Sequence, residues 1–172
     1  THRVERYNLY NQILSYCGWT TTNESMHKVT GLKQKFTMDQ IALEIIASVV
    51  GPNKAVLEIV AMVFGALAKN PKALSLFENQ AKGVDAGNFQ ILPCIATSDG
   101  EVIMIKTCMQ FSSSKRVTKV LFWEWSNTDV SLYTAASNTT LNRRQYGVVR
   151  NTIMEKLGTS GKNFIENIDI DI

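Results

Sequence analysis

The sequence predicts a single α+β domain, in which an antiparallel meander of four to five β-strands packs against helical hairpins. Three observations predict this class. Apolar residues recur at helical spacing through residues 37–83, and after Gly87 the pattern changes to alternation with a period of two. The chain of 172 residues, 45% apolar and 19% charged, suits one globular domain with its own core. Helices followed by strands favour helices packed on a single antiparallel sheet.

The N-terminal segment, residues 1–36, is expected to hold one helix and a loop arm. Apolar and aromatic side chains recur at three- to four-residue spacing over residues 3–17, and Gly18 suits the end of that helix. Residues 20–36 are polar and have no clear period, which is typical of a loop or linking arm. The first residues carry charges of both signs and no apolar run, so we expect no retained signal peptide and leave a secreted or cytoplasmic location open.

Residues 37–83 are expected to be helical. Thr37 and Gln40 fit a capping box, in which the Thr37 hydroxyl accepts a hydrogen bond from the amide three residues on, and they open an apolar helix through Val50. Gly51 then suits a left-handed stop, and Pro52 suits the start of a second helix, residues 53–69.

A third short helix follows the break at Asn70-Pro71 and ends at Gly83. Charged residues and a Gly-Pro-Asn breaker interrupt the apolar stretch 41–68, so it falls short of the ~20 apolar residues of a membrane-spanning helix.

The meander is expected over residues 87–137. A β-hairpin is predicted from alternation over residues 89–95, turn residues at 98–100 and a strand pattern from Val102 to Phe111. Further turns separate a third strand over residues 117–125 from a fourth strand over 130–135. Pro93 departs from this pattern because it cannot donate a hydrogen bond to a ladder.

The C-terminal part predicts a last helix over residues 140–158 and an edge strand over 163–170. The helix pattern rests on one apolar side, formed by Tyr146, Val149, Ile153 and Leu157. The alternating acidic residues of the tail would discourage pairing beyond that edge strand.

The sequence predicts no catalytic site, no metal site and no cofactor, so we expect a protein that is not an enzyme. Of the two histidines, His2 lies near the terminus and His27 in the polar arm, where neither has the neighbours of a triad or a metal site. Glu44 and Glu58 fit the solvent side of amphipathic helices, and a buried acid pair is the alternative. The glycine-containing segment 158–163 lacks the first glycine and the final Ser or Thr of a phosphate loop.

Charge and cysteine content exclude other classes. A net charge of only +3 is far from the clustered positive surface that nucleic acids require, so no nucleic-acid partner is expected. Cys17, Cys94 and Cys108 have no metal-binding spacing and suit buried thiols, although a Cys94–Cys108 disulfide stays open.

The aromatic run 121–125 is the most concentrated in the chain. Alternation places Leu121, Trp123 and Trp125 on one face and Phe122 on the other, which favours a central strand covered on both sides. A stacking platform for bases or sugars and a membrane-interface anchor are the alternatives. A ligand pocket between helices and sheet near the two tryptophans is a further hypothesis, for which the sequence offers no polar constellation.

The order of these elements resembles that of the cytolytic delta-endotoxin (Cyt) type of pore-forming protein, which includes volvatoxin-like cytolysins. The resemblance spans residues 40–140 and rests on the apolar helical pair and on the strand segments 88–91, 99–104, 119–123 and 126–133. It implies a sheet wrapped by helical hairpins that move away at a lipid surface, so that long amphipathic strands enter the bilayer and oligomerise. The chain is short for this family and shows no obvious leading β arm.

The leading hypothesis is therefore a membrane-active, pore-forming or cytolytic protein that oligomerises on lipid. Residues 102–112 and 117–126 approach the roughly 9–11 residues that a transmembrane strand needs. The candidates for membrane insertion are Val102, Met104, Ile105, Val120, Phe122, Trp123 and Trp125. The alternative is a non-enzymatic, self-assembling structural protein that forms homo-oligomers through the edge strand and apolar helix surfaces.

Overall fold

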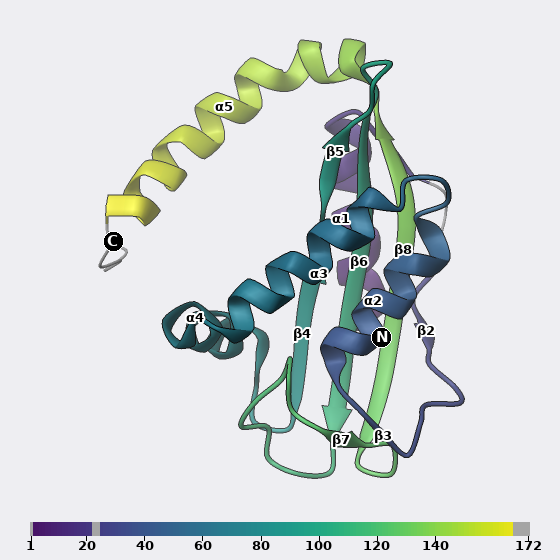
Figure 1. Cartoon of the computed structure of the whole chain (residues 1–172). Coiled ribbons are helices and arrows are strands. Elements are labelled where there is room, and N and C mark those ends of the chain that lie inside the picture. The colour runs from purple at the N-terminus through teal and green to yellow at the C-terminus, as the bar shows by residue number, and fades with distance from the viewer. Residues whose placement is uncertain (1, 22–24, 167–172) are drawn as a thin grey trace.

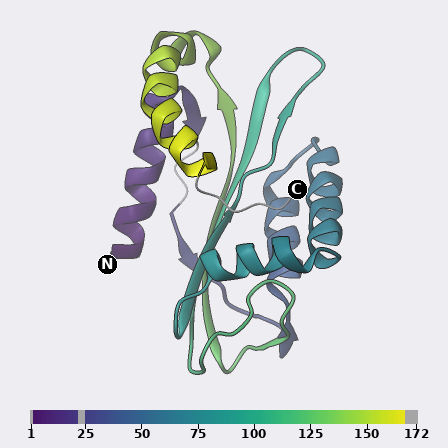
Figure 2. The same cartoon turned by 90° about the vertical axis from the view of Figure 1, so that its left-hand side faces the viewer.

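The computed structural model describes residues 2–21 and 25–166, with side chains through residue 163. It confirms the α+β class, because in this part of the chain a six-stranded antiparallel sheet carries helices on both faces (Figures 1 and 2). Figure 2 shows the sheet close to edge-on, with α1 (His2–Tyr16) on one side and α2 (Met38–Val49) and α3 (Ala55–Ala68) on the other.

Three strands form the centre of the sheet. β4 (Ala86–Ile91) pairs with β6 (Val102–Ser113), and β6 pairs with β8 (Val130–Leu141), all antiparallel. β5 (Cys94–Ala96) continues along β6 beyond Pro93, where the missing N–H interrupts the ladder. The hairpin predicted from the turn residues 98–100 is confirmed as β5–β6.

The polar arm contains short strands that the sequence pattern did not predict. β1 (Trp19–Thr21) and β2 (His27–Lys28) pair with two separate stretches of β8. β3 (Lys35–Phe36) pairs with β7 (Trp125–Ser126) in a small second sheet. The expectation of a loop over residues 20–36 was wrong at these positions, because short edge strands need only backbone partners and leave no apolar alternation in the sequence.

The main core lies between one face of the sheet and the helices α2, α3 and α4 (Pro71–Ala81). Both long central strands and all three helices contribute to it. Its larger buried members are Phe36, Met38, Ile41, Ile46, Val56, Val60, Phe64, Phe89, Ile103, Ile105, Met109, Phe111, Leu121, Trp125 and Leu132. The apolar stripes of the predicted helices are thus buried on the sheet, as amphipathic helices require.

Only some of the helix ends match those predicted from the sequence. Gly51 has a φ of 58° directly after α2, which confirms the left-handed stop. Asn70 caps α4 by accepting a hydrogen bond from the Ala73 amide at 3.1 Å. Thr37 is the N-cap of α2, but its hydroxyl makes no capping hydrogen bond and is buried without a partner, so the predicted capping box was wrong. Pro52 lies in the turn before α3 and not within the helix.

The strand predicted over residues 117–125 is not formed. Residues 117–124 are an irregular loop, and only Trp125 and Ser126 join a strand. The Glu78 carboxylate of α4 accepts hydrogen bonds from the backbone amides of Val120 and Leu121, the latter at 3.0 Å. The indole N–H of Trp125 donates to the Val120 carbonyl at 3.0 Å. These bonds satisfy two amides and one carbonyl of the loop without a neighbouring strand.

The C-terminal helix is longer than predicted and starts later. β8 extends to Leu141, so residues 140 and 141 are in the sheet, and α5 (Arg143–Glu166) passes through Gly158 instead of ending there. The predicted edge strand over residues 163–170 was wrong for residues 163–166, which are helical, and residues 167–170 lie outside the described residues.

Gly87 of β4 is fixed by packing and not by backbone conformation. A Cβ atom at this position would overlap the ring of Phe111 and approach the Ala81 carbonyl oxygen to 2.8 Å. Gly147 of α5 has open space around the same position. These two glycines therefore form a matched pair for the same substitution.

We expect Gly87→Ala to lower the free energy of unfolding by about 1–3 kcal/mol, because the added methyl group overpacks the Phe111 side of β4. Gly147→Ala should raise it by about 0.5–1 kcal/mol, since alanine favours a helix. Urea unfolding followed by circular dichroism measures both. Equal effects of the two substitutions would contradict this packing account.

The Glu78 contacts yield a second prediction. Glu78→Gln keeps the size of the side chain but replaces a charged acceptor of two buried amides, so the free energy of unfolding should fall by about 2–3 kcal/mol. Glu58→Gln, on the exposed side of α3, is the control and should change it by less than about 0.5 kcal/mol. Urea unfolding compares the two, and a similar small effect at both positions would contradict a structural role for Glu78.

Candidate functional site

Helix α3 is apolar on its outer side as well as on its core side. Val56 and Phe64 are buried against the sheet, whereas Met62 and Val63 on the outer side are 69% and 56% exposed. Glu58 is the only charged residue among the 14 residues of this helix. A surface helix ordinarily turns a polar side to water, so the outer side of α3 is shaped for an apolar partner.

Helix α5 leaves the body of the protein at the end of β8 and arches away from the sheet (Figures 1 and 2). It has 24 residues, and Met154 and Leu157 on it are 54% and 62% exposed. Basic residues outnumber acidic ones, with Arg143, Arg144, Arg150, Lys156 and Lys162 against Glu155 and Glu166. A basic amphipathic helix of this kind suits an apolar surface that carries negative charge.

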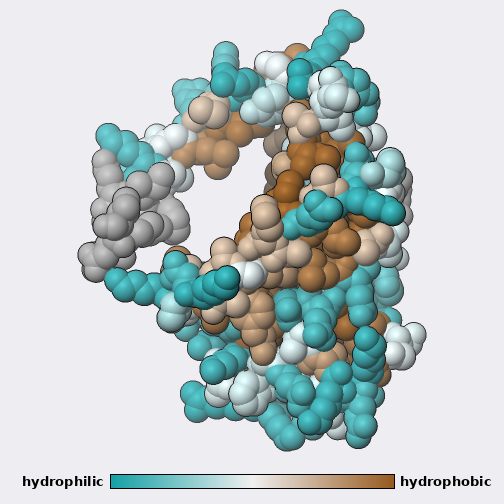
Figure 3. Space-filling view, viewed as in Figure 1, coloured by the Kyte–Doolittle hydropathy of each residue, from teal (hydrophilic) through white to brown (hydrophobic). Residues whose placement is uncertain are grey.

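The two helices face the same open space. Figure 3 shows hydrophobic residues on the inner side of α5 and, across a gap, on the facing side of α3 and the adjoining sheet edge. We name five exposed apolar side chains, three on α3 and two on α5, the apolar concavity. They are Ile59, Met62 and Val63 of α3 with Met154 and Leu157 of α5. Each of the two helices thus has an apolar face in contact with water.

No described helix is by itself long and apolar enough to cross a membrane. Helices α3 and α4 reach that length and composition only together, and they are bent by 106° at their junction.

The insertion candidates on β6 are shielded by the fold. Met104 is 4% exposed and Ile105 is fully buried, and they lie on opposite faces of the sheet because they are neighbours in a strand. Val102, at the start of the strand, is half-buried. Residues 103–109 are therefore buried on both faces of the strand and present little surface to lipid in this conformation.

The four aromatic-run candidates lie in or next to the loop formed by residues 117–124. Val120 and Trp125 are buried, and the Phe122 ring meets Phe64 of α3 edge-on at a centroid distance of 6.5 Å. Trp123 is 48% exposed. The expected alternation, with Trp123 and Trp125 sharing a strand face, was wrong because this segment is not a strand.

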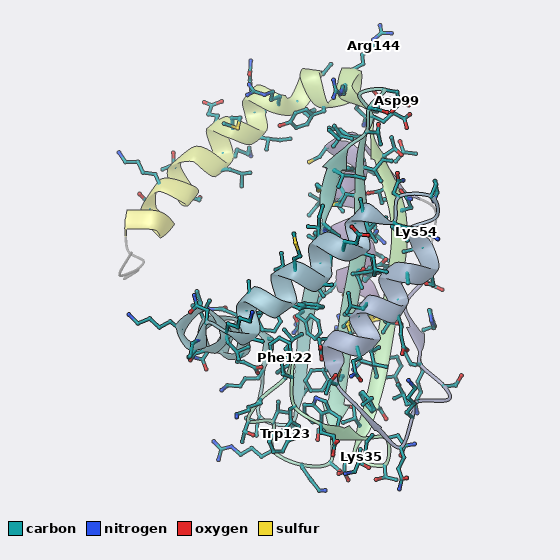
Figure 4. The ribbon with its side chains drawn as sticks, viewed as in Figure 1. Lys35, Lys54, Asp99, Phe122, Trp123 and Arg144 are labelled. Atoms are coloured by element: carbon teal, nitrogen blue, oxygen red, sulfur yellow. The ribbon has the colours of Figure 1, made fainter. Side chains whose placement is uncertain are left out.

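A small, mainly apolar pocket adjoins Trp123 but not Trp125, and it is lined by α4 and the loop instead of by the sheet. It measures about 350 Å³ and lies between α4 and the loop, with Leu74, Phe122 and Trp123 among its lining residues (Figure 4). Lys82 and Lys119 also line it. An aromatic wall with two flanking lysines suits a membrane interface, where tryptophan and lysine side chains meet headgroups.

The histidines and glutamates that the sequence offered for catalysis do not converge, and His2 pairs with Glu5 of its own helix at 3.2 Å. His2 and His27 are both exposed, on α1 and β2. Glu44 is 61% exposed and pairs with Lys33 at 3.7 Å, and Glu58 is exposed, so they are solvent-facing and not a buried acid pair. Among the described residues, no group of three His, Cys, Asp or Glu side chains could hold a metal ion.

The three cysteines are free thiols. Cys108 is buried, Cys17 is half-buried and Cys94 is exposed, so burial was predicted wrongly for Cys94. Cys94 stands opposite Met104 in the sheet, four positions along β6 from Cys108. That separation is about 13 Å, which no disulfide spans.

No protein-family model matches the chain, and no curated protein matches its sequence.

Sequence reasoning missed the outer side of α3 and the full length of α5. The signal for α3 was present, because a helix with one charge in 14 residues is too apolar for a single buried stripe. The projection of α5 carries no such signal, since its pattern of Tyr146, Val149, Ile153 and Leu157 is that of a helix packed on its own core.

Proposed function

We propose that the protein is membrane-active, and that it binds a lipid surface through the apolar concavity and oligomerises there as a pore-forming or cytolytic toxin. One observation carries this proposal: α3 and α5 both expose apolar side chains, and they do so around one gap. Transfer of each such side chain from water into lipid contributes about 1.5–3 kcal/mol to the free energy of membrane binding.

Charge supports the same assignment. The basic residues of α5 add roughly 1 kcal/mol each when they approach an anionic leaflet. Trp123 and Lys119, at the end of the molecule near α4, provide a second contact of interfacial type. A sheet with helices packed on it is also what the resemblance to the Cyt type of cytolysin implies.

Attachment and insertion are separate steps in this proposal. Attachment uses residues that are already exposed, such as Met62 and Leu157, and needs no rearrangement. Insertion of Met104 and Ile105 requires α2–α4 and α1 to leave the sheet, because these helices cover them. β6 and β8 each have 12 residues, which is long enough for the roughly 9–11 residues of a transmembrane strand.

A second candidate function is self-assembly without lipid, as a structural protein. It is favoured by the exposure of apolar side chains on α3 and α5, which a second copy would cover. Light scattering with and without vesicles separates the two. A monomer in solution that oligomerises only on vesicles supports the toxin, whereas a stable oligomer without lipid supports the assembly.

We expect Met62→Glu to weaken vesicle binding about tenfold or more, since it places a carboxylate in the apolar concavity. Val84→Glu is the matched control, because Val84 is 75% exposed in the loop before β4 and outside this surface. Co-sedimentation with vesicles and dye release measure binding and leakage. The absence of both from the unmodified protein at micromolar concentration over pH 5 to 9, or equal losses for the two variants, would contradict the proposal.

The double substitution of Arg144 and Arg150 by Gln should weaken binding to anionic vesicles about tenfold or more, at roughly 1 kcal/mol for each charge. Binding to zwitterionic vesicles should change little. Raising the salt concentration should narrow the difference between the variant and the unmodified protein, because salt screens exposed charges. A loss that is equal on both vesicle types would assign α5 a packing role instead of an electrostatic one.

A further inference from the structure

A second cavity, separate from the apolar concavity, lies on the α1 side of the sheet. It measures about 540 Å³ and is enclosed by the N-terminal half of α1, the end of α4 and the faces of β4 and β6. Figure 2 looks onto this edge of the sheet, with α1 beside it and α4 running across it. The volume is in the range of a small-molecule site.

Cations line this cavity, and carboxylates do not. Arg3, Arg6 and Lys82 are among the lining residues, and none of these residues is Asp or Glu. The Arg3 guanidinium lies over the Tyr133 ring, 4.2 Å from its centroid, which fixes its position. Lys82 donates to the Thr118 carbonyl at 3.4 Å. Among the described residues no carboxylate pairs with Arg3, Arg6 or Lys82, and Glu5 pairs with the lining residue His2 at 3.2 Å. The lining is therefore positively charged on balance.

The acidic groups at the cavity keep their protons at neutral pH. Burial raises the pKa of the Cys108 thiol above its usual value. Burial also raises the pKa of the Tyr10 hydroxyl, and the neighbouring Cys108 and Cys94 raise it further. Neither group then cancels the charge of the arginines.

Three carboxamides form the floor of the cavity. Asn88 of β4 stands opposite Gln110 of β6, and Gln90 stands opposite Cys108, so all four side chains share one face of the sheet. Carboxamides both donate and accept hydrogen bonds, which matches the hydroxyl groups of a sugar or polyol. The arginines instead match phosphate oxygens, which they bind in a bidentate manner.

We propose that this cavity binds a phosphorylated polyol, such as an inositol phosphate or a sugar phosphate, either free or as a lipid headgroup. The phosphate lies between Arg3, Arg6 and Lys82, and the hydroxyl groups lie on Asn88, Gln90 and Gln110. The site lies outside the apolar concavity and does not depend on the proposed membrane activity.

Titration calorimetry of the full chain tests binding in the absence of lipid. Inositol 1-phosphate and glucose 6-phosphate should bind, inorganic phosphate should bind more weakly, and inositol and glucose should not bind measurably. No heat from either phosphorylated polyol at millimolar concentration would overturn the proposal, and it would leave vesicle binding through α3 and α5 unaffected.

Two substitutions assign the contacts. Lys82→Gln should weaken the affinity for inositol 1-phosphate about tenfold or more, since it removes a charged donor. Lys54→Gln also removes one positive charge, but at the α2–α3 turn, away from the cavity (Figure 4). It should leave the affinity for inositol 1-phosphate unchanged. An equal loss of affinity in the two variants would indicate that net charge alone attracts the ligand, and it would overturn the proposed binding site.

Gln110→Leu separates the polyol from the phosphate contacts. It should weaken the affinity for inositol 1-phosphate severalfold and leave the affinity for inorganic phosphate unchanged. The reason is that only the hydroxyl groups of the ligand contact the carboxamide. An equal loss of affinity for the two ligands would overturn the proposal that the carboxamides bind the hydroxyl groups. Vesicles with and without phosphatidylinositol then identify the source of the ligand. Loss of phosphatidylinositol-dependent binding in Gln110→Leu indicates a lipid headgroup, and unchanged vesicle binding in this variant indicates a free ligand.

Discussion

The structure depends on the central strand β6, which has neighbours on both edges and cover on both faces. Every residue from Ile103 to Met109 is buried, and the strand pairs with β4 and β5 on one side and with β8 on the other. A strand of this kind leaves no backbone group to water and needs apolar or satisfied side chains above and below. The two helical layers follow from that need.

The two faces meet this need in different ways. On one face, α2, α3 and α4 bury a continuous apolar core. On the other face, α1 covers a polar surface, where Lys106 is only 1% exposed, donates to Asn11 and lies 5.0 Å from the centroid of the Tyr7 ring. A buried ammonium group needs such partners, because leaving it without them in the interior is costly. The polar layer is therefore also the layer in which a cationic cavity forms.

Glu78 connects the core to the surface chemistry. Its carboxylate holds the backbone of Val120 and Leu121, and this places Phe122 against α3 and leaves Trp123 exposed beside α4. The apolar concavity lies on the far side of α3, and the cationic cavity lies beyond the end of α4. The α3–α4 pair, bent by 106° at its junction, thus adjoins both surfaces.

The sequence by itself determined the elements that local patterns specify. The helices over residues 37–83, the Gly51 stop and the β5–β6 hairpin follow from periodicity and turn residues, which depend on neighbours in the chain. Only the tertiary structure decided the loop over 117–124, whose alternating residues suit a strand but whose amides bond to a distant carboxylate. It also decided the projection of α5 and both candidate sites, because exposure and convergence depend on residues far apart in sequence.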